Sequence, residues 1–273
     1  MTSPTAPAPT FSPVQRVGRV RFQSLRIITA LILREAASRF GNTTGGYLWS
    51  FAEPVAGILL LSVAFSYLLA SPPIGDSFFL FYTSGVVPLL FFNALSSALA
   101  QSVTANKGLL TYPIVSVLDV IVARSLLETL TYGAVFSIIV VVTVQMDDID
   151  LRPDLLQIIA ALLLVGLLGM AVGMTNCILF LYFPMWRNIW RILTRPMLII
   201  SGVMFTYDSM PQELQHWLWF NPVLQIIGLM RGGIYASYND SYVSIVYIVL
   251  LSAMLIAVSG YFIRMEQSRL IQQ

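Results

Sequence analysis

Long apolar runs separated by short polar segments recur along this chain. Each run is close to the roughly 20 apolar residues that a helix needs to cross a membrane. The pattern predicts an all-α membrane protein with six transmembrane helices. The expected spans are Leu48–Ala70, Phe78–Ala100, Val120–Val144, Leu155–Tyr182, Ile189–Thr206 and Val243–Ile263. The fifth is the least regular, because Arg191, Arg195 and Pro196 interrupt its first half.

The segment Asp208–Tyr242, just before the last expected span, departs from this pattern. It contains two apolar stretches, Leu214–Phe220 and Val223–Ile234, which are separated at Asn221-Pro222. Each stretch is too short to cross a membrane. The lengths therefore predict a re-entrant helical hairpin, in which two packed helices enter the membrane and return to the same side. Bent backbone at membrane depth is tolerated only against protein or a water-filled path, so the hairpin indicates a transporter or channel.

The residues before the first span have a different character. Arginines alternate with aliphatic residues in Val14–Phe40 at roughly helical spacing, which predicts an amphipathic helix in the cytoplasmic membrane interface. This helix is either a simple anchor or a guide for an acidic substrate beside the transport path. Met1–Pro13 has four prolines and no apolar core, so it is expected to be a disordered tail. The expected domains are thus a tail over 1–13, an interfacial helix over 14–46 and a transmembrane domain over 47–273.

The basic residues set the expected orientation. Of the 15 Lys and Arg residues, 13 flank the ends of the spans on one side, and only Arg152 and Arg231 fall opposite. The loops on the opposite side are acidic. The positive-inside rule therefore places both termini in the cytoplasm and the hairpin outside it. With 57% hydrophobic and 10% charged residues, the chain is a multi-pass membrane protein without a nucleic-acid signature.

The cytoplasmic segment Gln101–Asp119 is moderately apolar but too short to cross the membrane. Leu109, Leu110 and Tyr112 form an apolar cluster within it. Two interpretations remain open: the segment docks into a groove on a partner protein, or it packs on the protein's own helix ends. Lys107 is the only lysine and does not belong to a P-loop motif, so the chain is expected to hold no nucleotide site of its own. Energy for uphill transport must then come from a cytoplasmic partner, which favours docking.

Few charged residues lie inside the expected spans. Arg124 and Glu128 are four residues apart and share one helix face, so we expect a structural ion pair near the membrane interface. Glu53 is expected to bond a cytoplasmic arginine or backbone groups. His216 and Cys177 are the only residues of their types, which excludes a multi-histidine metal site and an internal disulfide. No catalytic constellation is present, and we expect this chain to bind no cofactor.

Four stretches, in order along nearly the whole chain, resemble one known family. They are Leu33–Pro54, Phe81–Leu99, Asn106–Glu128 and Ser201–Tyr235. They resemble the membrane permease of ABC exporters for bacterial surface polysaccharides, most closely the capsular branch. The resemblance implies a homodimer in the inner membrane that exports a lipid-linked, acidic polysaccharide. It also implies two cytoplasmic ATPase subunits that carry ATP and Mg²⁺, and periplasmic and outer-membrane export proteins as further partners.

The resemblance also assigns roles to residues. Coupling to the ATPase falls on Asn106, Lys107, Leu109, Leu110, Tyr112 and Pro113. Aromatic candidates for the sugar path are Tyr47, Trp49, Phe51, Tyr67, Tyr82, Phe91 and Phe92. Candidate entrance arginines are Arg34, Arg39, Arg187 and Arg191. The expected exit gate comprises Trp217, Asn221, Pro222, Ile227 and Arg231. Aromatic rings stack on sugar C–H surfaces, although aromatic residues at span ends also face lipid, and the positive-inside bias alone also places arginines near the cytoplasm.

Within the gate, Arg231 is the sharpest candidate. It either fixes the re-entrant turn through an acidic partner or contacts the exiting polymer. Three alternatives to a capsule exporter remain: a permease for O-antigen, teichoic acid or a small molecule, an ion channel, and a membrane-integral enzyme. A channel is expected to carry a ring of charge or a carbonyl-rich filter sequence, and the chain shows neither.

Overall fold

The structure, a computed structural model, describes residues 23–40, 46–106, 116–147 and 152–265. This part of the chain is built from helices without a β-strand. The long helices are α1 (Gln23–Phe40), α2 (Gly46–Ser66), α3 (Phe78–Ala100), α6 (Val117–Asp147), α7 (Leu155–Tyr182) and α12 (Ile245–Met265). The shorter ones are α4 (Ser102–Ala105), α8 (Trp186–Thr194), α9 (Met197–Ile200), η1 (Tyr207–Ser209), α10 (Gln212–Leu218) and α11 (Pro222–Ile234).

Four of the predicted spans are single long helices. The observed α3 and α7 begin and end at the predicted residues, and α6 and α12 differ from their predictions by a few residues at each end. These four helices are long and apolar enough to cross a membrane. The predicted first span corresponds to α2, whose 21 residues begin two residues before the predicted start and end four residues before the predicted end. The four long spans support a membrane protein, whereas the predicted count of six is not confirmed.

The fifth expected span, Ile189–Thr206, is not a single helix in the structure. Here α8 ends at Thr194, and α9 covers a single turn before the chain leaves helical geometry. Pro196 lies at the break, where it removes one backbone N–H from the helical ladder. Gly202 then adopts a φ of +73°, a left-handed conformation that L residues with a side chain rarely take. The arginines and the proline in this part of the sequence thus coincide with a break in the helix.

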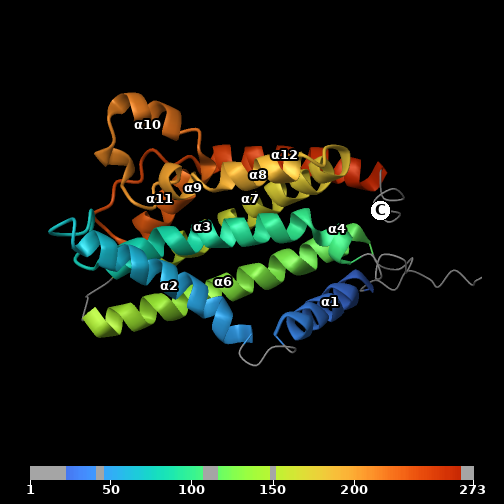
Figure 1. Cartoon of the computed structure of the whole chain (residues 1–273), viewed down its shortest axis with the longest axis horizontal. Helices are drawn as coiled ribbons and strands as arrows, with labels where there is room; N and C mark the ends of the chain where they lie inside the picture. The colour runs from blue at the N-terminus through green and yellow to red at the C-terminus, as the bar shows by residue number, and fades with distance from the viewer. Residues whose placement is uncertain (1–22, 41–45, 107–115, 148–151, 266–273) are drawn as a thin grey trace, which may run out of the picture.

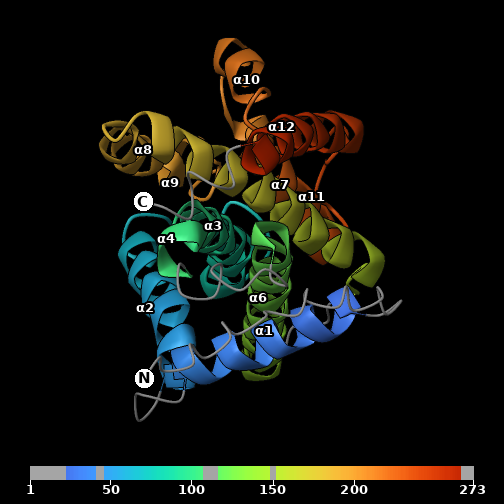
Figure 2. The ribbon, with the colours of Figure 1, turned by 90° about the vertical axis from the view of Figure 1, so that its right-hand side faces the viewer.

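Helix α3 is the centre of the bundle (Figure 2). It packs against α2, α6, α7 and α11, and 16 of its 23 residues are buried. Its most extensive contact is with α7, where Gly169 lies against Leu95 and Gly173 lies against Ser96 and Leu99. A Cβ atom added at Gly173 would lie 2.7 Å from the Leu99 Cβ atom. Small residues at this spacing let helix backbones approach closely in membranes, where burial from water does not drive association.

The long helices run along the longest axis and define two ends of the molecule (Figure 1). One end carries α1 and α4 and is called the α4 end. The other carries α10 and the 67–77 and 235–244 loops and is called the α10 end. Helix α1 crosses the bundle at the α4 end, where it packs mainly on α6 (Figure 2).

Candidate functional site

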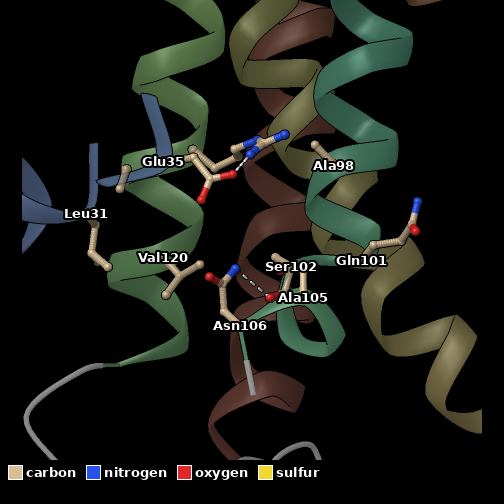
Figure 3. A pocket seen from close by; sticks show the side chains of 10 residues that line it. Leu31, Glu35, Ala98, Gln101, Ser102, Ala105, Asn106 and Val120 are labelled. Carbon is tan, nitrogen blue, oxygen red and sulfur yellow. Dashed lines mark hydrogen bonds and ion pairs between the residues drawn. The ribbon is translucent and has the colours of Figure 1, made fainter. Parts of the chain in front are cut away.

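At the α4 end, one arginine joins two helices through two carboxylates. The predicted pair of Arg124 and Glu128 is confirmed, with the Arg124 Nε atom 3.2 Å from Glu128 Oε1. The structure adds Glu35 of α1, whose Oε1 atom is ion-paired with Arg124 Nη1 (Figure 3). Glu128 is fully buried, and a buried carboxylate is stable only with a cation or hydrogen-bond donors beside it. Arg124 therefore fastens α1 to α6.

A cavity of about 290 Å³ lies beside this ion pair, between α1, α4 and α6 (Figure 3). Asn106 borders it, and its Nδ2 atom donates to the Ser102 carbonyl at 3.0 Å. Its Oδ1 atom accepts from Arg34 Nη1 of α1 at 3.5 Å. Helix α1 thus contacts Asn106, which precedes segment 107–115, and also α6, which follows that segment. The remaining coupling candidates lie outside the described residues: Lys107, Leu109, Leu110, Tyr112 and Pro113.

At the α10 end, the two helices of the predicted hairpin differ in burial. The break between them is confirmed, with Asn221 as the N-cap of α11. All residues of α11 except Pro222 and Gly232 are buried. The prediction that α10 is also packed is wrong, since Trp217 is 76% exposed and α10 stands clear of the bundle (Figure 1). Leu214 of the same helix is exposed as well, so its apolar side chains do not pack on the bundle.

Arg231 lies in the last turn of α11 and is only 1% exposed. Its Nη1 atom donates to the Phe205 carbonyl at 2.8 Å and its Nη2 atom to the Val203 carbonyl at 3.0 Å. Its Nε atom donates to Ser84 Oγ of α3 at 3.3 Å. Its guanidinium also lies 4.3 Å from the centre of the Phe81 ring, a favourable cation–π distance.

These contacts decide between the two roles predicted for Arg231. Contact with an exiting polymer is contradicted, because the side chain is buried. The role of fixing the turn is supported, but its partners are two backbone carbonyls, a serine hydroxyl and an aromatic ring instead of an acid. A guanidinium group suits this site because its N–H groups point in several directions within one plane, so they can donate to several oxygen atoms at once.

The N-terminal end of α11 also contacts the part of the chain around the end of α9. Asn221 caps α11 by accepting from the Val223 N–H at 3.0 Å. Its Nδ2 atom also donates to the Ile200 carbonyl at 3.2 Å. The chain that follows α9 is therefore attached to α11 at two points, through Asn221 and Arg231. A displacement of α11 would carry this broken segment with it.

A second set of contacts joins the α11 helix to the 235–244 loop. The buried Gln225 side chain donates to the Trp219 carbonyl at 2.6 Å and accepts from the Ser244 N–H at 2.9 Å. Tyr242 lies against Gly228, where an added Cβ atom would overlap its phenol oxygen. Burial raises the pKa of Tyr242 above its ordinary value, so the phenol stays protonated and shares its 2.7 Å hydrogen bond with Tyr238.

The aromatic candidates for the path separate into two groups. Tyr82, Phe91 and Phe92 are buried in the core, so the prediction that they line a path on this subunit is wrong. The cause is the central position of α3, which turns its aromatic rings toward the other helices of the same chain. Phe51 is half-buried beside an apolar groove, and Tyr67 is 87% exposed. These two stay candidates, and the side chains of Tyr47 and Trp49 lie outside the described residues.

The entrance arginines that the structure describes are exposed. Arg34 bonds Asn106, and Arg187 lies 5.3 Å from the centre of the Phe180 ring. Arg191 is also exposed on α8, while the Arg39 side chain lies outside the described residues. The three placed arginines come from α1 and α8, and the structure does not join them into one cluster.

Sequence reasoning missed two structural residues. Glu35 shares the Arg124 ion pair, and the only signal is its position as the single carboxylate of α1. Gln225 joins α11 to two other segments, and the signal is one amide within the apolar stretch that precedes Arg231. A buried amide requires hydrogen-bond partners, so such a residue can be singled out even before its partners are known.

Known proteins match this chain over most of its length. Residues 26–235 match the family described as ABC-2 type transporter. The chain is 31% identical over 223 residues to the polysialic acid transport protein KpsM of Escherichia coli, which covers 82% of this chain and 86% of that protein. It is 27% identical over 231 residues to the capsule polysaccharide export inner-membrane protein CtrC of Neisseria meningitidis serogroup A, covering 85% and 87%. It is 28% identical over 225 residues to BexB of Haemophilus influenzae, another capsule polysaccharide export inner-membrane protein, covering 82% and 84%.

Proposed function

Because the chain belongs to the ABC-2 type transporter family, we propose that it is the permease subunit of an ATP-driven exporter of a capsular polysaccharide. It is a membrane transport subunit, with ATP hydrolysis on a separate subunit. The observation that carries the proposal is the similarity to capsule export proteins over more than four fifths of the chain. We further propose a polymer that is acidic and attached to a lipid.

We propose a homodimer, and the position of α3 supports it. A hydrated polysaccharide cannot cross hydrocarbon and needs a protein-walled, water-filled path. Helix α3 and its buried side chains fill the centre of the subunit, which leaves little room for a polymer there. A path between two copies related by a two-fold axis avoids this difficulty. Helices α2 and α8 lie on the same side of the bundle and are candidates for the walls of this path (Figure 2).

We propose that the ATPase subunit binds the chain near Asn106–Pro113 at the α4 end. The support is the arrangement of α1, which is bound to Asn106 on one flank of this segment and to Arg124 on the other. A displacement of this segment would then move α1 and α6 together. ATP and Mg²⁺ belong to the ATPase in this proposal, and this chain binds neither.

We propose that the α4 end and both termini face the cytoplasm of a bacterium and that the α10 end faces outward. The distribution of basic residues supports this orientation. In this orientation α11 and the attached segment after α9 form the exit gate. The exposed α10 helix is then available to periplasmic or outer-membrane export proteins.

Purification of the tagged permease from its own membranes tests the coupling proposal. The wild-type chain is expected to retain a P-loop ATPase subunit. The double substitution Lys107→Glu with Leu109→Asp is expected to release it, because it reverses a charge and removes an apolar contact. Arg152→Glu is the matched control, since it reverses a charge on the opposite side of the membrane. Retention of the ATPase by the double variant, with an unchanged size-exclusion profile, would contradict coupling through this segment.

A further inference from the structure

An apolar groove of about 440 Å³ lies between α2 and α6. Val55 and Leu59 of α2 line it on one side, and Ile138 and Val142 of α6 line it on the other. Leu59, Ile138 and Val142 are each about half exposed, so the groove is open to the surroundings of the bundle. Because α6 is long and apolar enough to cross a membrane, these surroundings are the acyl chains of the bilayer.

A polar recess of about 410 Å³ continues the groove at the α10 end, where α2 and α6 both end (Figure 1). Phe79 and Asp147 line the groove and the recess alike, so the two spaces meet at these residues. Asp76, Ser62 and Ser77 also line the recess. Among the residues that the structure describes, no basic side chain lines it. The recess therefore combines negative charge with hydroxyl groups.

Two side chains of the recess have hydrogen-bonding capacity for a bound molecule. The Ser77 hydroxyl donates to Asp147 Oδ2 at 2.6 Å, which holds this carboxylate beside the start of α3 and leaves its other lone pairs for a ligand. Ser62 is only 8% exposed, and its hydroxyl has no hydrogen-bond partner among the described residues. Ser66, one turn further along α2, instead donates to the Val63 carbonyl at 2.9 Å. Buried hydroxyls are normally hydrogen-bonded, so Ser62 indicates a polar ligand group in the recess.

We propose that the groove and the recess together bind one molecule of phosphatidylethanolamine. Its ammonium group lies at Asp76 and Asp147, where it donates charge-assisted hydrogen bonds to the carboxylates. Its phosphate accepts a hydrogen bond from the Ser62 hydroxyl, and one acyl chain occupies the groove. The position of the recess fits a headgroup, because α3 begins at Phe78 and α6 ends at Asp147, where spans leave the hydrocarbon.

The length of the groove fits one acyl chain. The residues that line it on α6 extend from Ile138 to Met146. Eight residues of α-helix give a rise of about 12 Å, and the hydrocarbon of one leaflet is about 15 Å deep. An acyl chain that enters from the recess can therefore follow the groove through most of one leaflet.

The charge of the recess selects the headgroup. Two carboxylates repel an anionic headgroup such as phosphatidylglycerol, and they equally disfavour the acidic, lipid-linked polymer proposed as the substrate. Phosphatidylcholine has the same net charge as phosphatidylethanolamine, but its quaternary ammonium group has no N–H donor. The site is thus distinct from the export path, and it does not depend on the proposed export function.

A lipid bound in this way would connect three helices. It would contact α2 and α6 along the groove and α3 at Phe79. Helix α2, which packs on α3, would then be held to α6 as well. Phe51 also lines the groove, so it would contact the acyl chain instead of a sugar.

Native mass spectrometry of the full-length chain in mild detergent tests the headgroup contacts. The delipidated chain is titrated with phosphatidylethanolamine, phosphatidylcholine and phosphatidylglycerol that carry the same acyl chains. The wild-type chain is expected to bind phosphatidylethanolamine about tenfold more tightly than the other two lipids. The double substitution Asp76→Asn with Asp147→Asn is expected to abolish this preference. An amide oxygen at position 147 can still accept from Ser77, so the fold is expected to persist.

Three further variants complete the test. Glu213→Gln removes an exposed carboxylate on α10, at the same end of the molecule, and is expected to keep the preference. Val142→Trp fills the groove and is expected to weaken binding of phosphatidylethanolamine about tenfold. Val141→Trp places the same ring at the adjacent exposed position, outside the groove, and is expected to bind like the wild-type chain.

Four results would overturn the site. The first is equal wild-type affinity for phosphatidylethanolamine and phosphatidylcholine, and the second is a preference that survives in the double asparagine variant. The third is Ca²⁺ binding that requires both aspartates while the lipids bind equally, since the recess would then be a metal site. The fourth is a disulfide between two Val142→Cys chains in a Cys177→Ala background, because a second copy would then cover the groove.

Discussion

At the scale of single residues, Arg231 organises the α10 end. A buried guanidinium is costly unless its donors are satisfied, and here two carbonyls, a hydroxyl and an aromatic ring surround it. The sequence marked this residue because it is one of only two basic residues on its side. It did not reveal the partners, because backbone carbonyls carry no signal in the sequence. Two backbone carbonyls and the Ser84 hydroxyl take the place of the expected acidic partner.

Removal of the Arg231 fork is expected to destabilise the protein. Arg231→Gln leaves the Val203 and Phe205 carbonyls without their charged donors, at a cost of about 3 kcal/mol or more. Arg231→Lys keeps the charge but reaches fewer acceptors, so an intermediate loss is expected. The measurement is the free energy of unfolding in mild detergent.

Arg152→Gln is the matched control for this series, with an expected change within about 0.5 kcal/mol, since Arg152 is exposed. Equal stability of Arg231→Gln and the wild-type chain would show that the contacts at Arg231 do not hold the segment after α9.

At the scale of elements, the sequence predicted what hydrophobic pattern and length determine. The bounds of α3 and α7 follow from apolar runs of sufficient length, and the break at Asn221-Pro222 follows from capping chemistry. The pattern did not predict which apolar helix is central. It therefore left Tyr82, Phe91 and Phe92 as path candidates, although they fill the core. It also assigned α10 a packed face, because length alone does not tell a packed helix from a projecting one.

The contrast between α10 and α11 predicts different chemical accessibility. In a cysteine-free Cys177→Ala background, Trp217→Cys is expected to react with a membrane-impermeant maleimide added outside the cell. Ile227→Cys is expected to stay protected, because Ile227 is buried against the bundle. Equal, rapid labelling of both would show that the hairpin is a solvated loop and would remove the gate proposal.

The close approach of α3 and α7 predicts opposite effects for two helical glycines. Gly173→Ala places a methyl group 2.7 Å from the Leu99 Cβ atom and 3.0 Å from the Ser96 carbonyl oxygen, so it is expected to lower stability. Gly133→Ala, in α6, meets no atom within 4 Å beyond the local backbone of its own helix and is expected to raise stability by up to about 1 kcal/mol through helix propensity. Thermal unfolding of both variants in detergent gives the comparison, and similar shifts would contradict the packing at Gly173.

At the scale of the whole molecule, the subunit is a helical bundle with a filled centre and two specialised ends. At the α4 end, α1 connects both flanks of the proposed coupling segment. At the α10 end, α11 is attached to the chain that follows the interrupted fifth span. Such attachments would let a displacement at one end reach the other through α6, α7 and the broken segment. The family and the transport role follow from the sequence similarity, whereas the dimeric path rests on the position of α3.

The most direct test is the location of polysaccharide in cells that lack this chain. The account predicts polymer inside the cell and none on the surface, and restoration of surface polymer by the wild-type chain. It also predicts no restoration by the Lys107→Glu, Leu109→Asp double variant, provided that this variant reaches the membrane at the wild-type level. Surface polysaccharide that is unchanged in amount when the chain is absent would contradict an export function.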